Sequence, residues 1–67
     1  MQISARNQLT GKITNVKEGP VSTEVTLNVN GSEIVASITT ASAQALNLKV
    51  GDEATAIIKA SSVMIGK

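Results

Sequence analysis

The alternation of apolar and polar residues from Val21 to Asn30 constrains the fold of this chain more than any other feature. Of the five odd-numbered residues from 21 to 29, four are Val or Leu and the fifth is Thr23. The even-numbered residues from 22 to 30 are all polar. Such alternation is typical of a strand with one buried face. Asn30-Gly31 follows at once and predicts a tight hairpin, because both central residues of a type I′ turn need a positive φ.

The segment before this hairpin predicts another strand, with an irregularity in it. Leu9, Gly11 and Ile13 share one face of residues 9–16, whereas Val16 falls out of phase, which predicts a bulge or a strand end. A Glu-Gly-Pro turn at residues 18–20 separates this strand from the next.

The segment after the hairpin predicts three more strands and one helix. Ile34, Ala36 and Ile38 alternate along the returning strand and are expected to point inward. An Ala-rich run follows Thr39, and this pattern predicts one to two helical turns that end near residue 46. Two further strands are predicted after this helix, at residues 53–60 and 63–65.

These elements predict a mainly β fold, a five-stranded OB-like barrel with one short helix between its third and fourth strands. The core of such a barrel is thin, because the 67 residues include no Phe, Tyr or Trp. Disulfides cannot reinforce it, because the chain has no Cys. We therefore expect a single domain, residues 1–67, that oligomerises through its strands to bury apolar surface.

The charge balance argues against several classes of partner. Six basic and five acidic side chains give a net charge of +1, whereas a non-specific nucleic-acid or membrane binder carries a larger basic excess. The longest strictly apolar run is three residues, too short to span a bilayer, and the N-terminus lacks the apolar core of a signal peptide. We expect a cytoplasmic protein that binds neither nucleic acid nor membranes.

The chain has few side chains that could act in catalysis. No His is present to act as a general base, and the five carboxylates are scattered over turns and outer strand faces. The absence of Cys and His also removes the commonest ligands of a bare metal cation. The sequence predicts a non-enzyme that holds no metal as a bare cation.

Three short clusters, by contrast, are rich in hydrogen-bond donors and free of carboxylates. The clusters are Ser4 with Arg6, Thr39 with Ser42, and Lys59 with Ala60 and Ser61. The first occupies one side of an extended segment, the second opens the predicted helix, and the third ends the fourth strand. Donors of this kind suit a dianion whose oxygens only accept hydrogen bonds.

Each cluster also has an ordinary structural explanation. Thr39 with Ser42 fits a helix cap alone, Lys59 fits a solvated charge on an edge strand, and Arg6 fits an ion pair with a neighbouring subunit. Periodicity by itself does not bring the three clusters together.

Read in order, these motifs resemble the molbindins, small molybdate-binding proteins built from one Mop (TOBE-type) domain. The resemblance rests mainly on Ser-Ala-Arg-Asn-Gln-Leu at residues 4–9 and Ala-x-Ile-Lys-Ala-Ser-x-Val-Met-Ile at residues 56–65. It implies an OB-like fold, a homohexamer (a trimer of dimers) and oxyanion sites between subunits. The residues that it assigns to molybdate are Ser4, Arg6, Lys59, Ala60 and Ser61, completed by Thr39 and Ser42 from a different subunit.

The function that the resemblance implies is storage of cytoplasmic molybdate, with tungstate as a substitute, for molybdenum cofactor synthesis. The family is also described as binding molybdopterin, but a chain without aromatic residues offers a pterin no stacking partner, so the bare oxyanion is favoured.

Three alternatives remain open at this stage. Residues 46–54 resemble a segment of swapped-hairpin DNA-binding regulators, although such dimers need a basic face that this chain lacks. A nucleic-acid-binding OB domain is disfavoured by the missing aromatic residues. The third alternative is a regulatory piece of a larger transporter protein. Against it, we expect a complete small protein that starts at Met1 and ends just past its last strand.

Overall fold

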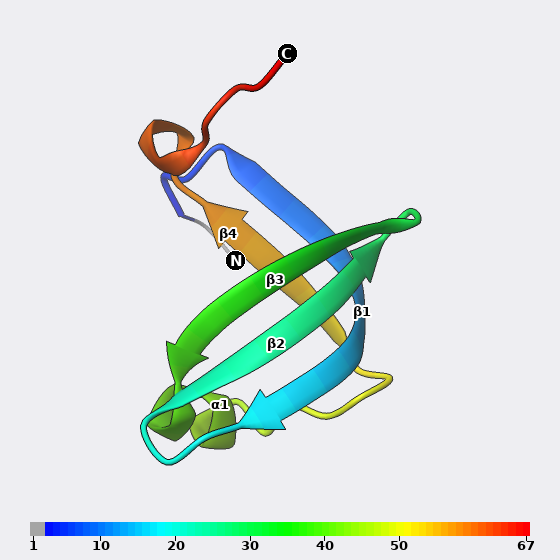
Figure 1. Cartoon of the computed structure of the whole chain (residues 1–67), viewed down its shortest axis with the longest axis vertical. Helices are drawn as coiled ribbons and strands as arrows, with labels where there is room; N and C mark the ends of the chain where they lie inside the picture. Colours follow the sequence, from blue (N-terminus) through cyan, green and yellow to red (C-terminus); the bar gives the residue numbers. More distant parts are fainter. Residues whose placement is uncertain (1–2) are drawn as a thin grey trace.

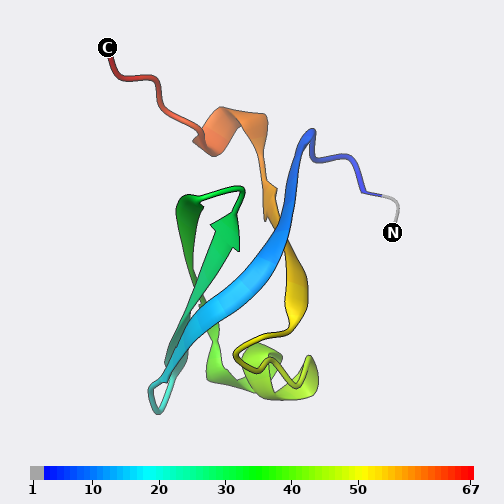
Figure 2. The ribbon, with the colours of Figure 1, turned by 90° about the vertical axis from the view of Figure 1, so that its right-hand side faces the viewer.

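The structure, a computed structural model, describes residues 3–67 and consists of one curled antiparallel sheet with a short helix at one end (Figures 1 and 2). The strands are β1 (Asn7–Glu18), β2 (Ser22–Val29), β3 (Ser32–Thr39) and β4 (Glu53–Ile58), and their order across the sheet is β3-β2-β1-β4. Helix α1 (Thr40–Ala45) follows β3, and a 3₁₀ turn, η1 (Ala60–Ser62), follows β4. Within residues 3–67, neither helical element has the length and apolarity needed to cross a membrane.

The predicted hairpin between β2 and β3 is confirmed. Asn30 and Gly31 have φ values of 51° and 90°, as a type I′ turn requires. The Gly31 amide donates to the Asn28 side-chain oxygen at 3.0 Å, which closes the turn. Strand pairing starts at once with Val29 opposite Ser32, so the turn sets the register of the two strands.

The out-of-phase Val16 is explained by a bulge in β1. Ile13 lies opposite Leu27 and Asn15 opposite Thr26, so Thr14 is an extra residue without a partner in β2. A bulge shifts the side-chain alternation by one position, and both Ile13 and Val16 therefore pack against the core. The predicted irregularity is thus real and lies two residues before Val16.

Gly11 lies where β1 changes its main partner from β4 to β2. It is opposite Ala54 of β4, and the next residue, Lys12, is opposite both Glu53 of β4 and Asn28 of β2. A Cβ atom at Gly11 would collide with the backbone carbonyl of Asn28. Glycine is therefore required for the close approach of β1 and β2 that curls the sheet.

The core is small and entirely aliphatic. Its buried centre is Ile13, Val25 and Leu27, and Ala43 of α1 is also buried. Partly buried side chains surround this centre: Val16, Val29, Ile34, Ile38, Leu48, Ala54 and Ala56. The inward positions predicted for β3 are confirmed by Ile34 and Ile38, whereas Val21, predicted on the inner face of its strand, precedes β2 and is 76% exposed.

Buried hydroxyl groups fasten α1 to the turn between β1 and β2. The Thr40 hydroxyl donates to the Gly19 carbonyl at 2.6 Å, and the Thr23 and Thr40 hydroxyl oxygens are 2.8 Å apart. Because the one Thr40 hydroxyl proton points to Gly19, Thr23 is the donor in the second bond. The Thr40 amide also donates to the Val21 carbonyl at 2.8 Å.

The predicted fifth strand, residues 63–65, does not form, and within residues 3–67 the sheet is an open half-barrel of four strands. Strand β4 ends at Ile58, two residues earlier than predicted, and η1 follows. The Ser62 and Val63 amides donate to the Lys59 and Ala60 carbonyls, and this tight turn sends residues 63–65 away from the sheet (Figure 1). The two edges of the sheet, β3 and β4, therefore have no closing strand between them among residues 3–67.

We predict that Thr40→Val destabilises the fold by about 1–3 kcal/mol, because the Gly19 carbonyl and the Thr23 hydroxyl lose their buried partner. Urea unfolding followed by far-ultraviolet circular dichroism, at one subunit concentration, measures the change. Thr10→Val is the matched control, since the Thr10–Thr55 hydroxyl pair is exposed, and we expect a change below about 0.5 kcal/mol. Equal losses in both variants would contradict the role of the buried network.

Candidate anion-binding site

The register between β1 and β4 brings two of the three donor clusters together. Asn7 opens β1 opposite Ile58, the last residue of β4, so the residues before Asn7 lie beside those after Ile58. The Asn7 side-chain amide donates to the Ile58 carbonyl at 3.3 Å and reinforces this junction. The Gln8 side chain donates to the Ala5 carbonyl at 3.1 Å and holds the preceding segment in a bend.

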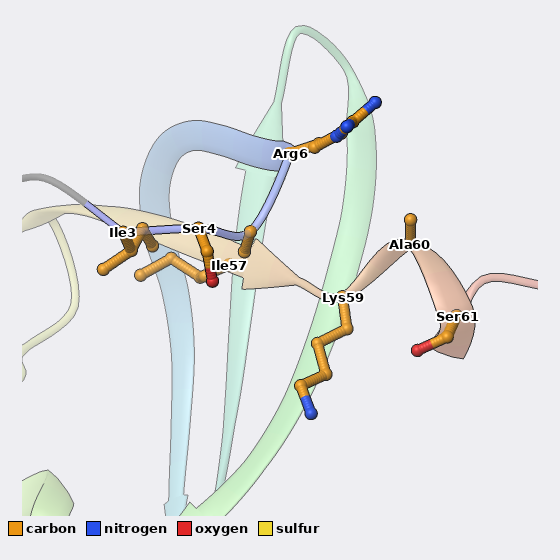
Figure 3. Close-up of a pocket in the computed structure, with 8 residues that line it drawn as sticks. Ile3, Ser4, Arg6, Ile57, Lys59, Ala60 and Ser61 are labelled. Carbon is orange, nitrogen blue, oxygen red and sulfur yellow. The ribbon is translucent and has the colours of Figure 1, made fainter.

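A groove of about 550 Å³ lies at this junction (Figure 3). Five of the seven residues predicted to bind the anion line it, namely Ser4, Arg6, Lys59, Ala60 and Ser61. None of the described lining residues is acidic. The groove therefore presents two cations and two hydroxyl groups without a carboxylate to repel an anion.

Backbone amides add to the donors on the η1 side of the groove. Lys59 occupies the N-cap position of η1, and the first amides to bond within the turn belong to Ser62 and Val63. The Ala60 and Ser61 amides come before them, at the start of the turn, where no carbonyl of the turn accepts from them. This arrangement supports the sequence-based interpretation of residues 59–61 as a set of donors.

The two cations of the groove do not converge on one point within the subunit. Figure 3 shows the Arg6 and Lys59 side chains extending in different directions from the groove, with Ser61 on the Lys59 side. Both cations are exposed.

The remaining donor cluster, Thr39 with Ser42, lies at the other end of the molecule. Thr39 is opposite Ser22, beside the end of β1 that is distant from Asn7, and the long axis of the structure measures 34 Å (Figure 1). Thr39 and Ser42 are both exposed. They therefore cannot complete the groove of their own subunit.

Thr39 acts as the cap of α1. Its hydroxyl oxygen accepts from the Ser42 amide at 3.1 Å, and its proton is donated to the Ser42 hydroxyl oxygen at 2.7 Å. The predicted cap is confirmed, and the Thr39 proton is already used. The Ser42 proton is left to point outward, so Ser42 is the better anion donor of the two.

The sequence did not point to the apolar part of the groove. Ile3, Ala5 and Ile57 line it beside the polar groups. Only the pairing of β1 with β4 brings these residues to the groove, and the alternation of residues within one strand does not reveal that pairing.

A second cavity, of about 250 Å³, lies between α1 and the sheet. Glu18 lines it, and its carboxylate accepts from the Gln44 side chain at 3.0 Å. A carboxylate in the wall disfavours an anion, so this cavity is a weaker candidate than the groove at the β1–β4 junction.

Comparison with known proteins places the whole chain in one family. The TOBE-domain family matches residues 3–65. A probable molybdenum-pterin-binding protein of Haemophilus influenzae is 48% identical, over 98% of this chain and 97% of its own length.

Solved structures agree with this match. The molybdate-binding protein of Sporomusa ovata is 36% identical, covers both chains completely and superposes with a TM-score of 0.95. The cytoplasmic molybdate-binding protein ModG, solved with molybdate bound, is 43% identical over 96% of this chain and 46% of its own, with a TM-score of 0.90. The half-barrel is thus the Mop variant of the OB-like fold, and the chain belongs to the TOBE-domain family, with the small molybdenum-pterin-binding proteins as relatives over its full length.

Proposed function

We propose that this chain binds molybdate, with tungstate as a substitute, in the groove at the β1–β4 junction. The observation that carries the proposal is the donor set of this groove, in which Arg6 and Lys59 stand beside hydroxyl groups and η1 amides without a carboxylate. Relatives of the same length are named for molybdenum-pterin or molybdate binding, which supports the same ligand here.

The donor set also favours some tetrahedral anions over others. Molybdate is fully deprotonated near neutral pH, whereas phosphate retains a proton that needs an acceptor. A site made of donors alone leaves that phosphate proton without a partner. Sulfate has the charge of molybdate but is smaller, so only the dimensions of the closed site can reject it, and tungstate is nearly as large as molybdate.

We propose further that each site is shared by two copies of the chain. The groove of one subunit contains Ser4, Arg6, Lys59, Ala60 and Ser61, and it is open to solvent. Thr39 and Ser42 lie at the far end of the same subunit. A neighbour that brings its own α1 end to the groove would supply the missing donors, as in the homohexamer that the family resemblance implies.

In biological terms, the proposal is reversible storage of molybdate in the cytoplasm, without catalysis. One structurally related protein, ModG, is described as cytoplasmic and molybdate-binding, which supports this assignment. The swapped-hairpin DNA-binding regulator stays an untested alternative. Its motif, residues 46–54, comprises the connection from α1 to β4 and the first two residues of β4, and the Gly51 amide within it donates to the Ile13 carbonyl at 2.8 Å.

We predict that Arg6→Ala and Lys59→Met each weaken molybdate binding by about tenfold to a hundredfold, because a hydrogen bond to a charged group contributes about 1.5–3 kcal/mol. Isothermal titration calorimetry measures the affinity. Lys12→Ala removes the same charge from the middle of β1, outside the groove, and should bind as the parent chain does. A loss in the control equal to that of Arg6→Ala would show a general charge effect and contradict the assignment.

We predict that chains carrying Arg6→Ala restore binding when they are refolded together with chains carrying Ser42→Ala. In the mixture, about a quarter of the sites would combine an intact groove with an intact Ser42, by random assortment at symmetric interfaces. Ser42→Ala keeps the amide that bonds Thr39, so the cap of α1 survives.

The control for this mixing experiment is Arg6→Ala refolded with Lys59→Met. Both residues belong to the groove of one subunit, so no mixture of these two chains contains an intact groove. Recovery in the first mixture and none in the second supports shared sites. No recovery in the first mixture contradicts them.

A further inference from the structure

The turn between β2 and β3 contains the sole asparagine in the sequence that precedes a glycine, in the pair Asn30-Gly31. The other asparagines each precede a larger residue: Asn7, Asn15, Asn28 and Asn47. A glycine amide has no side chain beside it and can approach the asparagine side-chain carbonyl closely. Asn30 is therefore the asparagine of this chain at which deamidation is chemically easiest.

This deamidation needs only water as a co-reactant. The Gly31 amide nitrogen loses its proton and attacks the side-chain carbonyl carbon of Asn30, and ammonia leaves as a five-membered succinimide ring closes. Water then opens the ring at either of its two carbonyl groups. One product is aspartate, and in the other, isoaspartate, the main chain runs through the side-chain carbon atoms.

Burial does not shield this bond from water. Asn30 and Gly31 are both exposed. Beyond the two chain neighbours of Gly31, no atom lies within 4 Å of the position that a Cβ of this residue would occupy. Hydroxide can therefore reach the amide, and the ring has space to form. Any restraint on the reaction must come from the hydrogen bonds and the backbone geometry of the turn.

Two features of the turn oppose ring closure. The Gly31 amide, which is the nucleophile, donates its proton to the Asn28 side-chain oxygen at 3.0 Å, and this bond must break before hydroxide removes the proton. Asn30 has a φ of 51° in a type I′ turn, in which ψ of the first central residue is about +30°. A planar succinimide ring instead needs a ψ of about −120°, as in a type II′ turn. The turn therefore has to open before the ring can close.

We propose that Asn30 is a deamidation site and that the Asn28 side chain sets the rate of its reaction. Asn28 is the penultimate residue of β2, opposite both Lys12 of β1 and Glu33 of β3, and this pairing holds it beside the turn. While its oxygen accepts from Gly31, the amide keeps its proton and the turn keeps the type I′ form. The inference rests on the hairpin alone and does not depend on which anion the chain binds.

The two products differ in their effect on the fold. Aspartate suits a type I′ turn as asparagine does, so it mainly adds a carboxylate at the end of the hairpin. Isoaspartate lengthens the main chain of the two-residue turn that sets Val29 opposite Ser32. It therefore disturbs the register of β3, whose Ile34 and Ile38 pack against the core.

Deamidation kinetics test the proposal. The parent chain and its variants are incubated in mildly alkaline buffer, and conversion at residue 30 is followed by peptide mass spectrometry. We expect Asn28→Ala to react about twofold to tenfold faster, the range that loss of one ordinary hydrogen bond gives. Asn28→Asp keeps an acceptor oxygen and should stay close to the parent rate. Glu33→Ala is the matched control, because it shortens the side chain opposite Asn28 without removing a bond to Gly31.

Hydrogen exchange of the Gly31 amide, measured by NMR, gives a second readout. Exchange and ring closure both begin with loss of the same proton, so both rates should rise together in Asn28→Ala, with circular dichroism reporting the retained sheet. Unfolding the parent chain in guanidinium chloride should remove the restraint and raise its deamidation rate above that of the folded parent. The proposal is overturned if the folded parent reacts as fast as the unfolded chain, or if Asn28→Ala reacts no faster than Glu33→Ala.

Discussion

The double pairing of β1 is the interaction on which the rest of the structure depends. Its first half pairs with β4 and its second half with β2, and at Lys12 both partners are engaged. Gly11 permits the close approach at this point, and the bulge at Thr14 returns the following residues to the core. Because β1 runs the length of the sheet, its two ends also set the distance between the donor clusters. The groove forms at the Asn7 end, and α1 is anchored near the Glu18 end.

A half-barrel of this size gains little stability from its own core. Three aliphatic side chains form the buried centre, and burial of such side chains contributes about 1.5–3 kcal/mol each. Much apolar surface remains outside, on residues 63–65 and on the edges of the sheet. The same architecture leaves the groove at the β1–β4 junction open and places Thr39 and Ser42 at the other end of the chain.

Local features of the fold could be predicted from the sequence because they depend on neighbouring residues. The Asn30-Gly31 turn, the Thr39 cap and the phase change before Val16 all follow from short-range geometry, and the structure contains each of them. The inward-facing side chains of β3 follow from the alternation of apolar and polar residues for the same reason. The TOBE family and the Mop-like fold could be predicted from the sequence motifs near the two chain ends.

Long-range features could not be predicted in the same way. Alternation does not say which strands pair, so it yields neither the joining of Ser4 and Arg6 with Lys59, which only the family resemblance implied, nor the apolar lining by Ile3 and Ile57. The fifth strand was expected within the subunit because its residues are apolar and extended, but the η1 turn directs them away. Sequence pattern identifies a strand-forming segment without revealing whether the preceding turn brings it to the sheet.

Native mass spectrometry of the purified chain, with molybdate and with sulfate at equal concentration, tests the central claim most directly. It counts subunits and bound anions together and needs no aromatic chromophore, which this chain lacks. The account predicts an assembly of several copies that gains molybdate in whole numbers and no sulfate. A monomer, or an assembly that takes up sulfate as readily as molybdate, would contradict it.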